Sequence, residues 1–323
     1  MRLRLTGRRR LEIERHASRD PIPEDEIRLD VLLCGVCRTD AKMWAQGHRD
    51  LILPRVPGHE IVAADNQGRR YVIWPGVTCG KCRYCLSGRE NLCPNIRIIG
   101  FHRDGGFADQ VTVPQTSLIP IPETLDLTVA CLAEPAGCVM HALAKCRVEE
   151  NVRVLIYGCG TMGLLTALAV RDCGAEALII EANPDKIKAT EAILSQCRIT
   201  CVSETDKTDF EVVINACPDP KAFKQGVGIL ARGGVFCFFS GLSGSPAMVM
   251  EEINSIHYRE NTIVGAYGLN RSDMRQAISF IQKNQTILIG LIEDVVGPEA
   301  ASHFLEAVLA GEKFRYILKF SGL

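Results

Sequence analysis

The sequence predicts an α/β protein with a doubly wound parallel sheet and a second, mostly β domain. Short continuous apolar runs, typical of buried parallel strands, alternate with helical segments between residues 152 and 239. Residues 54–115 are instead rich in glycine, proline and short apolar runs, which is typical of short strands with long connections. A chain of 323 residues is long enough for two domains, each with its own hydrophobic core.

The expected elements run from an N-terminal β region into the α/β core and back. We assign residues 1–135 and 266–323 to one domain and residues 136–265 to the other. The expected strands are 26–33, 152–157, 177–180, 211–215, 235–239 and 316–320, and the expected helical segments are 126–147, 164–173, 272–283 and 298–309.

The composition excludes several classes of protein. A net charge of -1 gives no electrostatic reason to expect nucleic acid or an anionic membrane as the main partner. The chain has no run of about 18 apolar residues and no apolar signal segment at its start, so we expect a cytoplasmic protein. Arginines near the N-terminus alternate with Leu3 and Leu5, which favours the solvated face of a strand.

The 15 cysteines do not indicate a disulfide scaffold, because such scaffolds belong to short secreted chains. Ten of them are scattered singly, and we expect these, such as Cys173, Cys197 and Cys237, to be small buried hydrophobes. The other five form patterns with neighbouring residues.

A glycine-rich turn follows the expected strand at 152–157 and opens a helix. Its sequence is Gly158-Cys159-Gly160-Thr161-Met162-Gly163, the spacing of a Rossmann dinucleotide-binding loop. The N–H groups and dipole of a helix N-terminus suit a pyrophosphate. Glu181 ends the next strand, where a carboxylate accepts hydrogen bonds from ribose hydroxyls and repels a 2′-phosphate. The sequence therefore predicts NAD rather than NADP.

Four cysteines lie close together in one loop. Cys79, Cys82 and Cys85 are spaced by three positions, and Cys93 follows eight positions later. Four thiolates suit a closed, structural zinc site. An iron–sulfur cluster is the alternative, but the ferredoxin pattern has three residues before its last cysteine and this loop has seven. We expect a structural zinc ion.

A second metal site is indicated by residues that lie further apart. Cys37 stands in a Cys-Gly-Val-Cys-Arg-Thr-Asp turn, and Gly58-His59-Glu60 follows. Glu134-Pro135 comes much later. One cysteine, one histidine and a carboxylate would give zinc three protein ligands and one open position, the arrangement of a catalytic ion.

These motifs together resemble the medium-chain zinc-dependent alcohol dehydrogenases over nearly the whole chain, including a closing Gly311-Glu312-Lys313-Phe314-Arg315 segment. The resemblance implies a GroES-like catalytic domain and a catalytic zinc ion held by Cys37, His59 and a residue at position 134. Glu134-Pro135 resembles the polyol and threonine dehydrogenase branch, in which Glu60 can also approach the metal. Which glutamate binds zinc directly stays open.

The resemblance also implies roles for other residues. It would place Arg38 and Arg315 near the cofactor pyrophosphate, and Glu181 with Lys186 around the adenosine ribose. It suggests a homodimer or homotetramer that pairs through the edge of the cofactor-domain sheet.

We expect hydride transfer between an alcohol, secondary or polyol-like, and NAD, with one catalytic and one structural zinc ion. Thr39 passes the alcohol proton outward in this mechanism. Many family members carry a histidine five positions after the zinc cysteine, but this chain has Lys42 there. Two alternatives are a catalytically degenerate NAD-binding homologue with a structural or regulatory role and a zinc module that binds nucleic acid, which the balanced charge disfavours.

Overall fold

The structure, a computed structural model, describes residues 1–15, 21–243, 250–311 and 313–320, so Glu312 of the closing motif lies outside the described residues. The chain divides into two compact units: Met1–Gly137 with Leu269–Leu323, and Cys138–Gly268. Among the described residues, every helix is too short or too polar to span a lipid bilayer.

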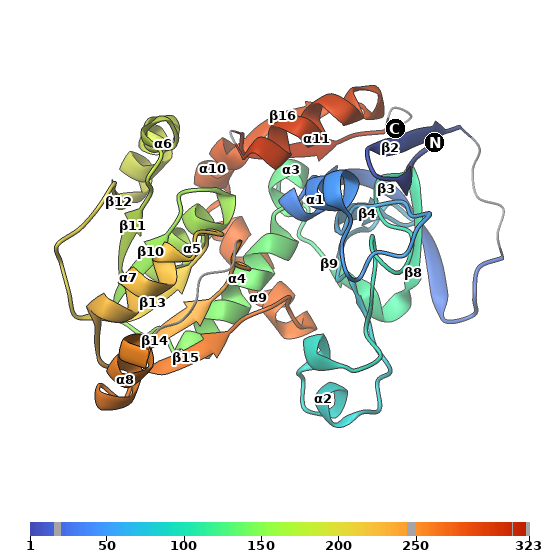
Figure 1. Ribbon diagram of the computed structural model, residues 1–323. Helices are drawn as coiled ribbons and strands as arrows, with labels where there is room; N and C mark the ends of the chain where they lie inside the picture. Colours follow the sequence, from blue (N-terminus) through green and yellow to red (C-terminus); the bar gives the residue numbers. More distant parts are fainter. Residues whose placement is uncertain (16–20, 244–249, 312, 321–323) are drawn as a thin grey trace. The chain divides into compact units, whose positions relative to one another are not determined.

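The unit Cys138–Gly268 contains a six-stranded sheet in which all strands are parallel (Figure 1). Numbered along the unit, the strand order is 3-2-1-4-5-6, the order of dinucleotide-binding sheets. The predicted doubly wound α/β class is confirmed. The strands are β10 (Arg153–Tyr157), β11 (Glu176–Ile180), β12 (Thr200–Val202), β13 (Phe210–Asn215), β14 (Leu230–Phe238) and β15 (Thr262–Gly265).

Burial explains why these segments form the sheet. Val154, Leu155 and Ile156 of β10 are completely buried, as expected of a central strand covered on both faces. Helix α5 (Thr161–Asp172) packs on β10 and β11, and α7 (Lys221–Ile229) packs on β13 and β14. The other helices of this unit are α6 (Pro184–Cys197), α8 (Met250–Tyr258) and the C-terminal part of α4 (Ala133–Cys146).

The other unit contains a seven-stranded sheet in which β3 is a central strand, pairing with β4, β8 and β17. All three pairings are antiparallel, and only β16 and β17 pair in parallel. This sheet forms the second, mostly β domain. Its strands are β3 (Glu26–Gly35), β4 (Glu60–Ala64), β5 (Arg70–Ile73), β8 (Gln110–Pro114), β9 (Leu118–Pro120), β16 (Ile292–Val296) and β17 (Arg315–Leu318).

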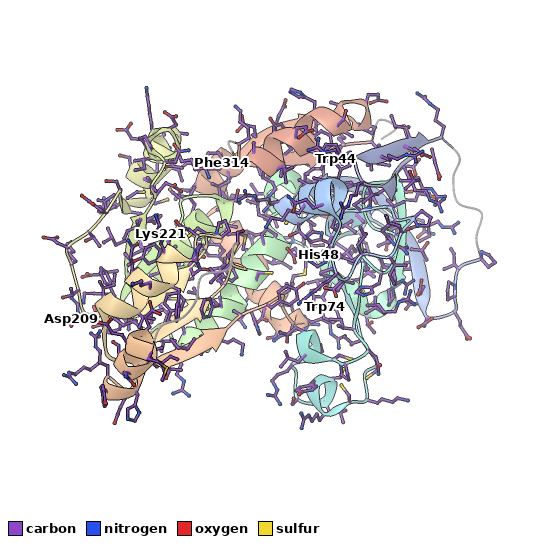
Figure 2. The ribbon with its side chains drawn as sticks, viewed as in Figure 1. Trp44, His48, Trp74, Asp209, Lys221 and Phe314 are labelled. Atoms are coloured by element: carbon purple, nitrogen blue, oxygen red, sulfur yellow. The ribbon has the colours of Figure 1, made fainter. Side chains whose placement is uncertain are left out.

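Smaller elements surround this sheet. Strands β1 (Arg2–Gly7) and β2 (Arg10–Glu14) form a hairpin, and β6 (Gly76–Val77) pairs with β7 (Arg97–Ile98). In Figure 2, Trp44 and Trp74 are labelled, and both are buried in this unit. The helices are α1 (Arg38–Gln46), α2 (Arg83–Leu86), α3 (Leu127–Ala130), α9 (Arg271–Lys283), α10 (Gln285–Leu288) and α11 (Ala301–Ala310), with 3₁₀ turns at Glu90–Leu92, Gln115–Ser117, Ile289–Leu291 and Pro298–Ala300.

Three expectations need comment. Leu3 and Leu5 are buried while Arg2 and Arg4 are partly exposed, as the alternating pattern predicted, but Ile13, which follows the same pattern in β2, is 40% exposed. The expected helical segment 126–147 is two helices, α3 and α4, because the chain turns between Ala130 and Ala133. The prediction that Cys173 is buried was wrong, since this residue caps the C-terminus of α5 at the surface.

Candidate functional site

Cys37 lies at the N-terminus of α1, where a helix favours a negatively charged group. It is the N-cap residue, and its sulfur accepts a hydrogen bond from Thr39 N at 3.4 Å. In return Asp40 Oδ2 accepts a hydrogen bond from Cys37 N at 2.9 Å, which completes a capping box. The sequence of this turn therefore holds the thiol in place through two local contacts.

Asp40 connects Cys37 to the segment that carries His59. This carboxylate is 1% exposed, and its Oδ1 accepts a hydrogen bond from Gly58 N at 3.3 Å. The same oxygen lies 3.4 Å from His59 Nδ1, as an ion pair without hydrogen-bond geometry. A carboxylate beside one ring nitrogen orients the imidazole and leaves Nε2 to act as a ligand. Sequence analysis quoted Asp40 in the cysteine turn but gave it no role.

Glu60 is the next residue, and its carboxylate is held from one side only. Arg315 Nη1 donates to Glu60 Oε1 at 2.7 Å and to Val36 O at 3.1 Å. Oε2, in contrast, is buried and has no hydrogen-bond partner within the described part of the chain. Buried polar atoms are almost always satisfied, so this oxygen calls for a ligand such as a cation.

Gly35 makes room for that carboxylate. Gly35 pairs with Glu60 across β3 and β4, and a Cβ atom at position 35 would lie 2.2 Å from Glu60 Oε2. A side chain there would push the carboxylate from its place. Sequence analysis missed this role, because it depends on the pairing of two strands 25 positions apart.

Cys37, His59 and Glu60 come together as one cluster of possible metal ligands, with their donor atoms within 4.8 Å of one another. Burial raises the pKa of Glu60 to about 7, against the lowering effect of Arg315. Burial also opposes ionisation of Cys37, but His59 and Arg315 outweigh it and lower the pKa of the thiol. A set of one thiol, one imidazole and one carboxylate fits zinc.

Two other predicted residues lie in the same unit. Glu134, in the first turn of α4, is not in the cluster of possible ligands, but it is buried and its charge contributes to raising the pKa of Glu60. Thr39 is half-buried in the first turn of α1, and Lys42 is exposed on the same helix. The structure therefore brings Glu60, rather than Glu134, to Cys37 and His59.

Cys79, Cys82, Cys85 and Cys93 form a second cluster of possible ligands. Neighbouring sulfur atoms are 3.5 Å apart for Cys82–Cys85, 3.6 Å for Cys79–Cys93 and 4.0 Å for Cys79–Cys85. Zinc bonds of about 2.3 Å in a tetrahedron place sulfur atoms about 3.8 Å apart, so these thiols fit one zinc ion. The separations are far longer than a disulfide bond, and all four cysteines are free.

The glycine-rich turn joins β10 to α5 in the other unit. Gly158 has a φ of +105°, which a residue with a side chain rarely adopts. A Cβ atom on Gly163 would lie 1.8 Å from Gly158 O, so only glycine fits there. A Cβ atom on Gly160 would meet open space, and Thr161 and Met162 begin α5. The turn thus has the close packing and the free helix N-terminus that a pyrophosphate needs.

Glu181 lies directly after β11 and contacts this turn. Its Oε2 accepts a hydrogen bond from Cys159 N at 3.0 Å, and its Oε1 accepts one from Asn183 N at 2.9 Å. Lys186 is half-buried in the first turn of α6, which begins at Pro184. The carboxylate is therefore held beside the glycine-rich turn, where sequence analysis expected a ribose contact.

The two arginines expected near the pyrophosphate have different surroundings. Arg38 is exposed, and its Nη2 donates to Leu309 O at 3.3 Å. Arg315 is 5% exposed and lies beside Glu60 in the metal-ligand cluster. The contact of Arg315 with Glu60 was not anticipated, because it depends on β17 pairing with β3.

Comparison with known proteins finds similar dehydrogenases. Residues 23–123 match the alcohol dehydrogenase GroES-like domain family. The chain is 28% identical to a sorbitol dehydrogenase of Halalkalibacterium halodurans, with 93% of each chain covered. It is 27% identical to an L-threonine 3-dehydrogenase of Bacillus subtilis, with 92% of this chain and 93% of the relative covered.

Solved structures share the fold over the full length. A zinc-binding dehydrogenase of Sinorhizobium meliloti bound to NADP has a TM-score of 0.87 at 24% identity, covering 98% of each chain. An alcohol dehydrogenase of Escherichia coli complexed with NADH has a TM-score of 0.87 at 20% identity, covering 99% of this chain and 98% of that one. The fold and the two sites define a zinc-type, nucleotide-dependent dehydrogenase. The chain is similar to the medium-chain alcohol dehydrogenases, and the relatives above include a polyol dehydrogenase and a threonine dehydrogenase.

Proposed function

We propose that this chain oxidises a secondary or polyol-like alcohol with NAD, using a zinc ion held by Cys37, His59 and Glu60. The observation that carries the proposal is the unpaired, buried Oε2 of Glu60 beside a thiol and an imidazole. Because that oxygen has no hydrogen-bond partner among the described residues while Oε1 is bound to Arg315, Glu60 is the better candidate for direct ligation. Glu134 would then act through water.

The chain's own residues have three tasks in this reaction. Asp40 orients His59, and Arg315 orients Glu60, so the ligands are in place before a metal arrives. A zinc ion held by Cys37, His59 and Glu60 would act as a Lewis acid toward an alcohol oxygen. Thr39 receives the alcohol proton at its hydroxyl and passes it outward. Lys42 on the surface of α1 does not replace the relay histidine, since an ordinary lysine is a poor base at neutral pH.

The proposed cofactor preference depends on Glu181. Its carboxylate is fixed by Cys159 N and Asn183 N at the edge of the glycine-rich turn. A fixed negative charge there accepts hydrogen bonds from a ribose diol and repels a 2′-phosphate, which supports NAD over NADP. The related structures contain either cofactor.

We also propose that the four-cysteine lobe, formed by Cys79, Cys82, Cys85 and Cys93, holds a second, structural zinc ion. Four thiolates at this sulfur spacing would fill the tetrahedral coordination of zinc and leave no open position for a substrate. Strands β12 and β15 are the two edges of the six-stranded sheet, and we propose that β15 pairs with its counterpart in a homodimer or homotetramer. Light scattering after size-exclusion chromatography would test this assembly, and a monomer would contradict it.

The alternative of a catalytically degenerate homologue is not supported, because the chain retains a complete ligand cluster and matches named dehydrogenases over most of its length. The test is reduced-nicotinamide formation with panels of polyols, secondary alcohols and amino alcohols, before and after chelation. We expect chelator-sensitive turnover of one class with NAD. Lack of turnover in protein shown to hold both zinc ions and bind NAD would contradict the proposed substrates.

A further inference from the structure

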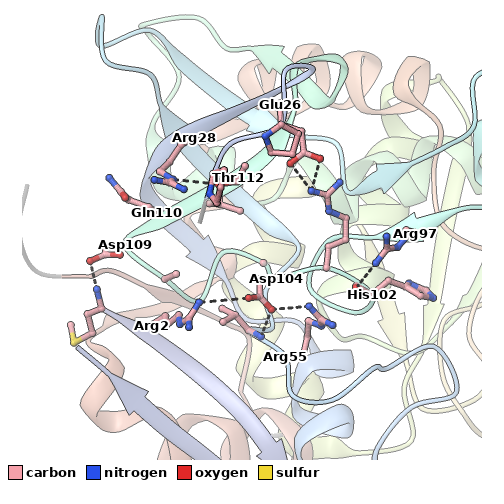
Figure 3. Close-up of a pocket in the computed structure, with 18 residues that line it drawn as sticks. Arg2, Glu26, Arg28, Arg55, Arg97, His102, Asp104, Asp109, Gln110 and Thr112 are labelled. Atoms are coloured by element: carbon pink, nitrogen blue, oxygen red, sulfur yellow. Dashed lines mark hydrogen bonds and ion pairs between the residues drawn. The ribbon is translucent and has the colours of Figure 1, made fainter. Parts of the chain in front are cut away.

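A cavity of about 520 Å³ lies in the unit Met1–Gly137 with Leu269–Leu323 (Figure 3). Residues from β1, β3 and β8 line it, together with segments at positions 55–56 and 97–105. None of the proposed zinc ligands is among its lining residues. It is therefore separate from the sites described above.

The lining of this cavity is rich in arginine. Five arginines and three carboxylates line it, together with the amino group of Met1, which pairs with Asp109, while Arg2 pairs with Glu14 outside the lining. In Figure 3 the labelled Arg2, Arg28, Arg55 and Arg97 lie around the same pocket and come from parts of the chain far apart in sequence. The arginines are Arg2, Arg28, Arg55, Arg97 and Arg103, and the carboxylates are Glu26, Asp104 and Asp109.

Carboxylates contact Arg103 and Arg55 and leave some of the N–H donors of each arginine unused. Arg103 Nη2 contacts Glu26 at 2.6 Å, and Arg55 Nη1 contacts Asp104 at 2.8 Å. These arginine side chains are only 22% and 15% exposed, so their positions are restricted. A guanidinium group has five N–H donors, and one carboxylate contact leaves others for a ligand. Fixed donors of this kind lower the entropy cost of binding.

Two further arginines contact neutral groups. Arg97 Nη2 donates to the backbone oxygen of His102 at 3.2 Å, and within the described residues Arg97 has no carboxylate partner. Arg28 Nε lies 3.5 Å from Thr112 Oγ1 on β8. The positive charge of Arg97 is therefore not balanced by a neighbouring acid in this part of the molecule.

We propose that this cavity binds a small phosphorylated sugar, such as a pentose phosphate, a hexose phosphate or a mononucleotide. Guanidinium groups bind phosphate through paired, charge-assisted hydrogen bonds. The carboxylates of Asp104 and Asp109 and the amide of Gln110 provide partners for sugar hydroxyls. The volume falls within the range of small-ligand sites.

The test uses the full-length, zinc-loaded protein with saturating NAD, so that the cofactor site is occupied. Isothermal titration with ribose 5-phosphate, glucose 6-phosphate and AMP identifies the preferred phosphorylated compound. Inorganic phosphate and ribose serve as fragments. We expect at least one phosphorylated sugar to bind, and to bind at least tenfold more tightly than either fragment.

The double variant Arg28→Gln/Arg97→Gln should weaken this binding at least tenfold. Arg275→Gln, an exposed arginine of α9 in the same unit, is the matched control and should bind normally. Circular dichroism checks the fold of each variant. Should the double variant fail to fold, Thr112→Glu places a negative charge beside Arg28 and should have the same effect.

Three results would overturn the proposal. The first is that none of the three phosphorylated compounds binds. The second is unchanged binding in the folded double variant or in Thr112→Glu, which would locate the ligand at another site. The third is binding of inorganic phosphate as tight as that of any phosphorylated sugar, which would leave an anion site without recognition of the sugar.

Discussion

Arg315 Nη1 and Glu60 Oε1 form a 2.7 Å ion pair in which both side chains are at most 5% exposed. A buried pair of this kind is costly to break from one side, because the remaining charge is left without compensation. The pair also uses only one oxygen of the carboxylate, and the other oxygen stays available beside Cys37 and His59. Arg315 is therefore a positioning residue for a zinc ligand, and this arrangement leads to the first prediction.

Glu60→Gln and Glu134→Gln should affect zinc differently. If Glu60 binds the metal directly, Glu60→Gln lowers zinc affinity at the catalytic site by about 100-fold or more. Loss of a direct ligand should cost more zinc affinity than mutation of a residue that only supports a ligand, which typically costs about 10–100-fold. Glu134→Gln should retain the zinc ion and lose activity only. Metal analysis after dialysis, with activity in parallel, measures both. Zinc loss in Glu134→Gln but not in Glu60→Gln would reverse the assignment.

Gly35→Ala should disturb the same site without removing any ligand. The new Cβ atom would lie 2.2 Å from Glu60 Oε2, so the carboxylate or the strand must move. We expect activity to fall at least about tenfold, with a loss of stability of about 1–3 kcal/mol from overpacking. Activity assays and thermal melting check this. The matched control is Gly228→Ala, where a Cβ atom meets open space on α7 and should be neutral or slightly stabilising.

Cys82→Ser should destabilise the protein through the four-cysteine lobe. A structural zinc ion contributes directly to folding, so loss of one thiolate lowers the melting temperature and zinc content falls by one ion per chain. Cys173→Ser, at an exposed cysteine, is the control and should melt like the parent. Calorimetry with metal analysis measures both effects. Equal melting temperatures for Cys82→Ser and the parent would rule out a structural zinc site.

The elements of the fold were predictable where the signal is local. The apolar run of β10, the glycine turn after it and the four-cysteine loop each depend on residues close in sequence, so spacing alone indicates their structure. The zinc cluster is different. Which glutamate meets Cys37 depends on the register of β3 with β4, and the place of Arg315 depends on β17 joining that sheet. Such long-range pairing leaves no periodic trace in the sequence.

The last prediction concerns Glu181 and the choice of cofactor. Glu181→Gln removes the negative charge and keeps one oxygen, so it can accept only one of the two hydrogen bonds from Cys159 N and Asn183 N, which go to different oxygens of Glu181. The other hydrogen bond is lost, and the repulsion of a 2′-phosphate disappears. We expect the ratio of kcat/KM for NAD over NADP to fall at least about tenfold, mainly because NADP improves, corresponding to about 1.4 kcal/mol.

Steady-state kinetics with both cofactors measure this ratio, and Glu176→Gln, on the exposed start of β11, is the control with an unchanged ratio. Because Glu181→Gln loses one of these two hydrogen bonds, a general loss of turnover with both cofactors would mean that the carboxylate supports the turn itself. An unchanged ratio in an active variant would mean that the cofactor preference is set by other residues, and the proposed role of Glu181 would be wrong.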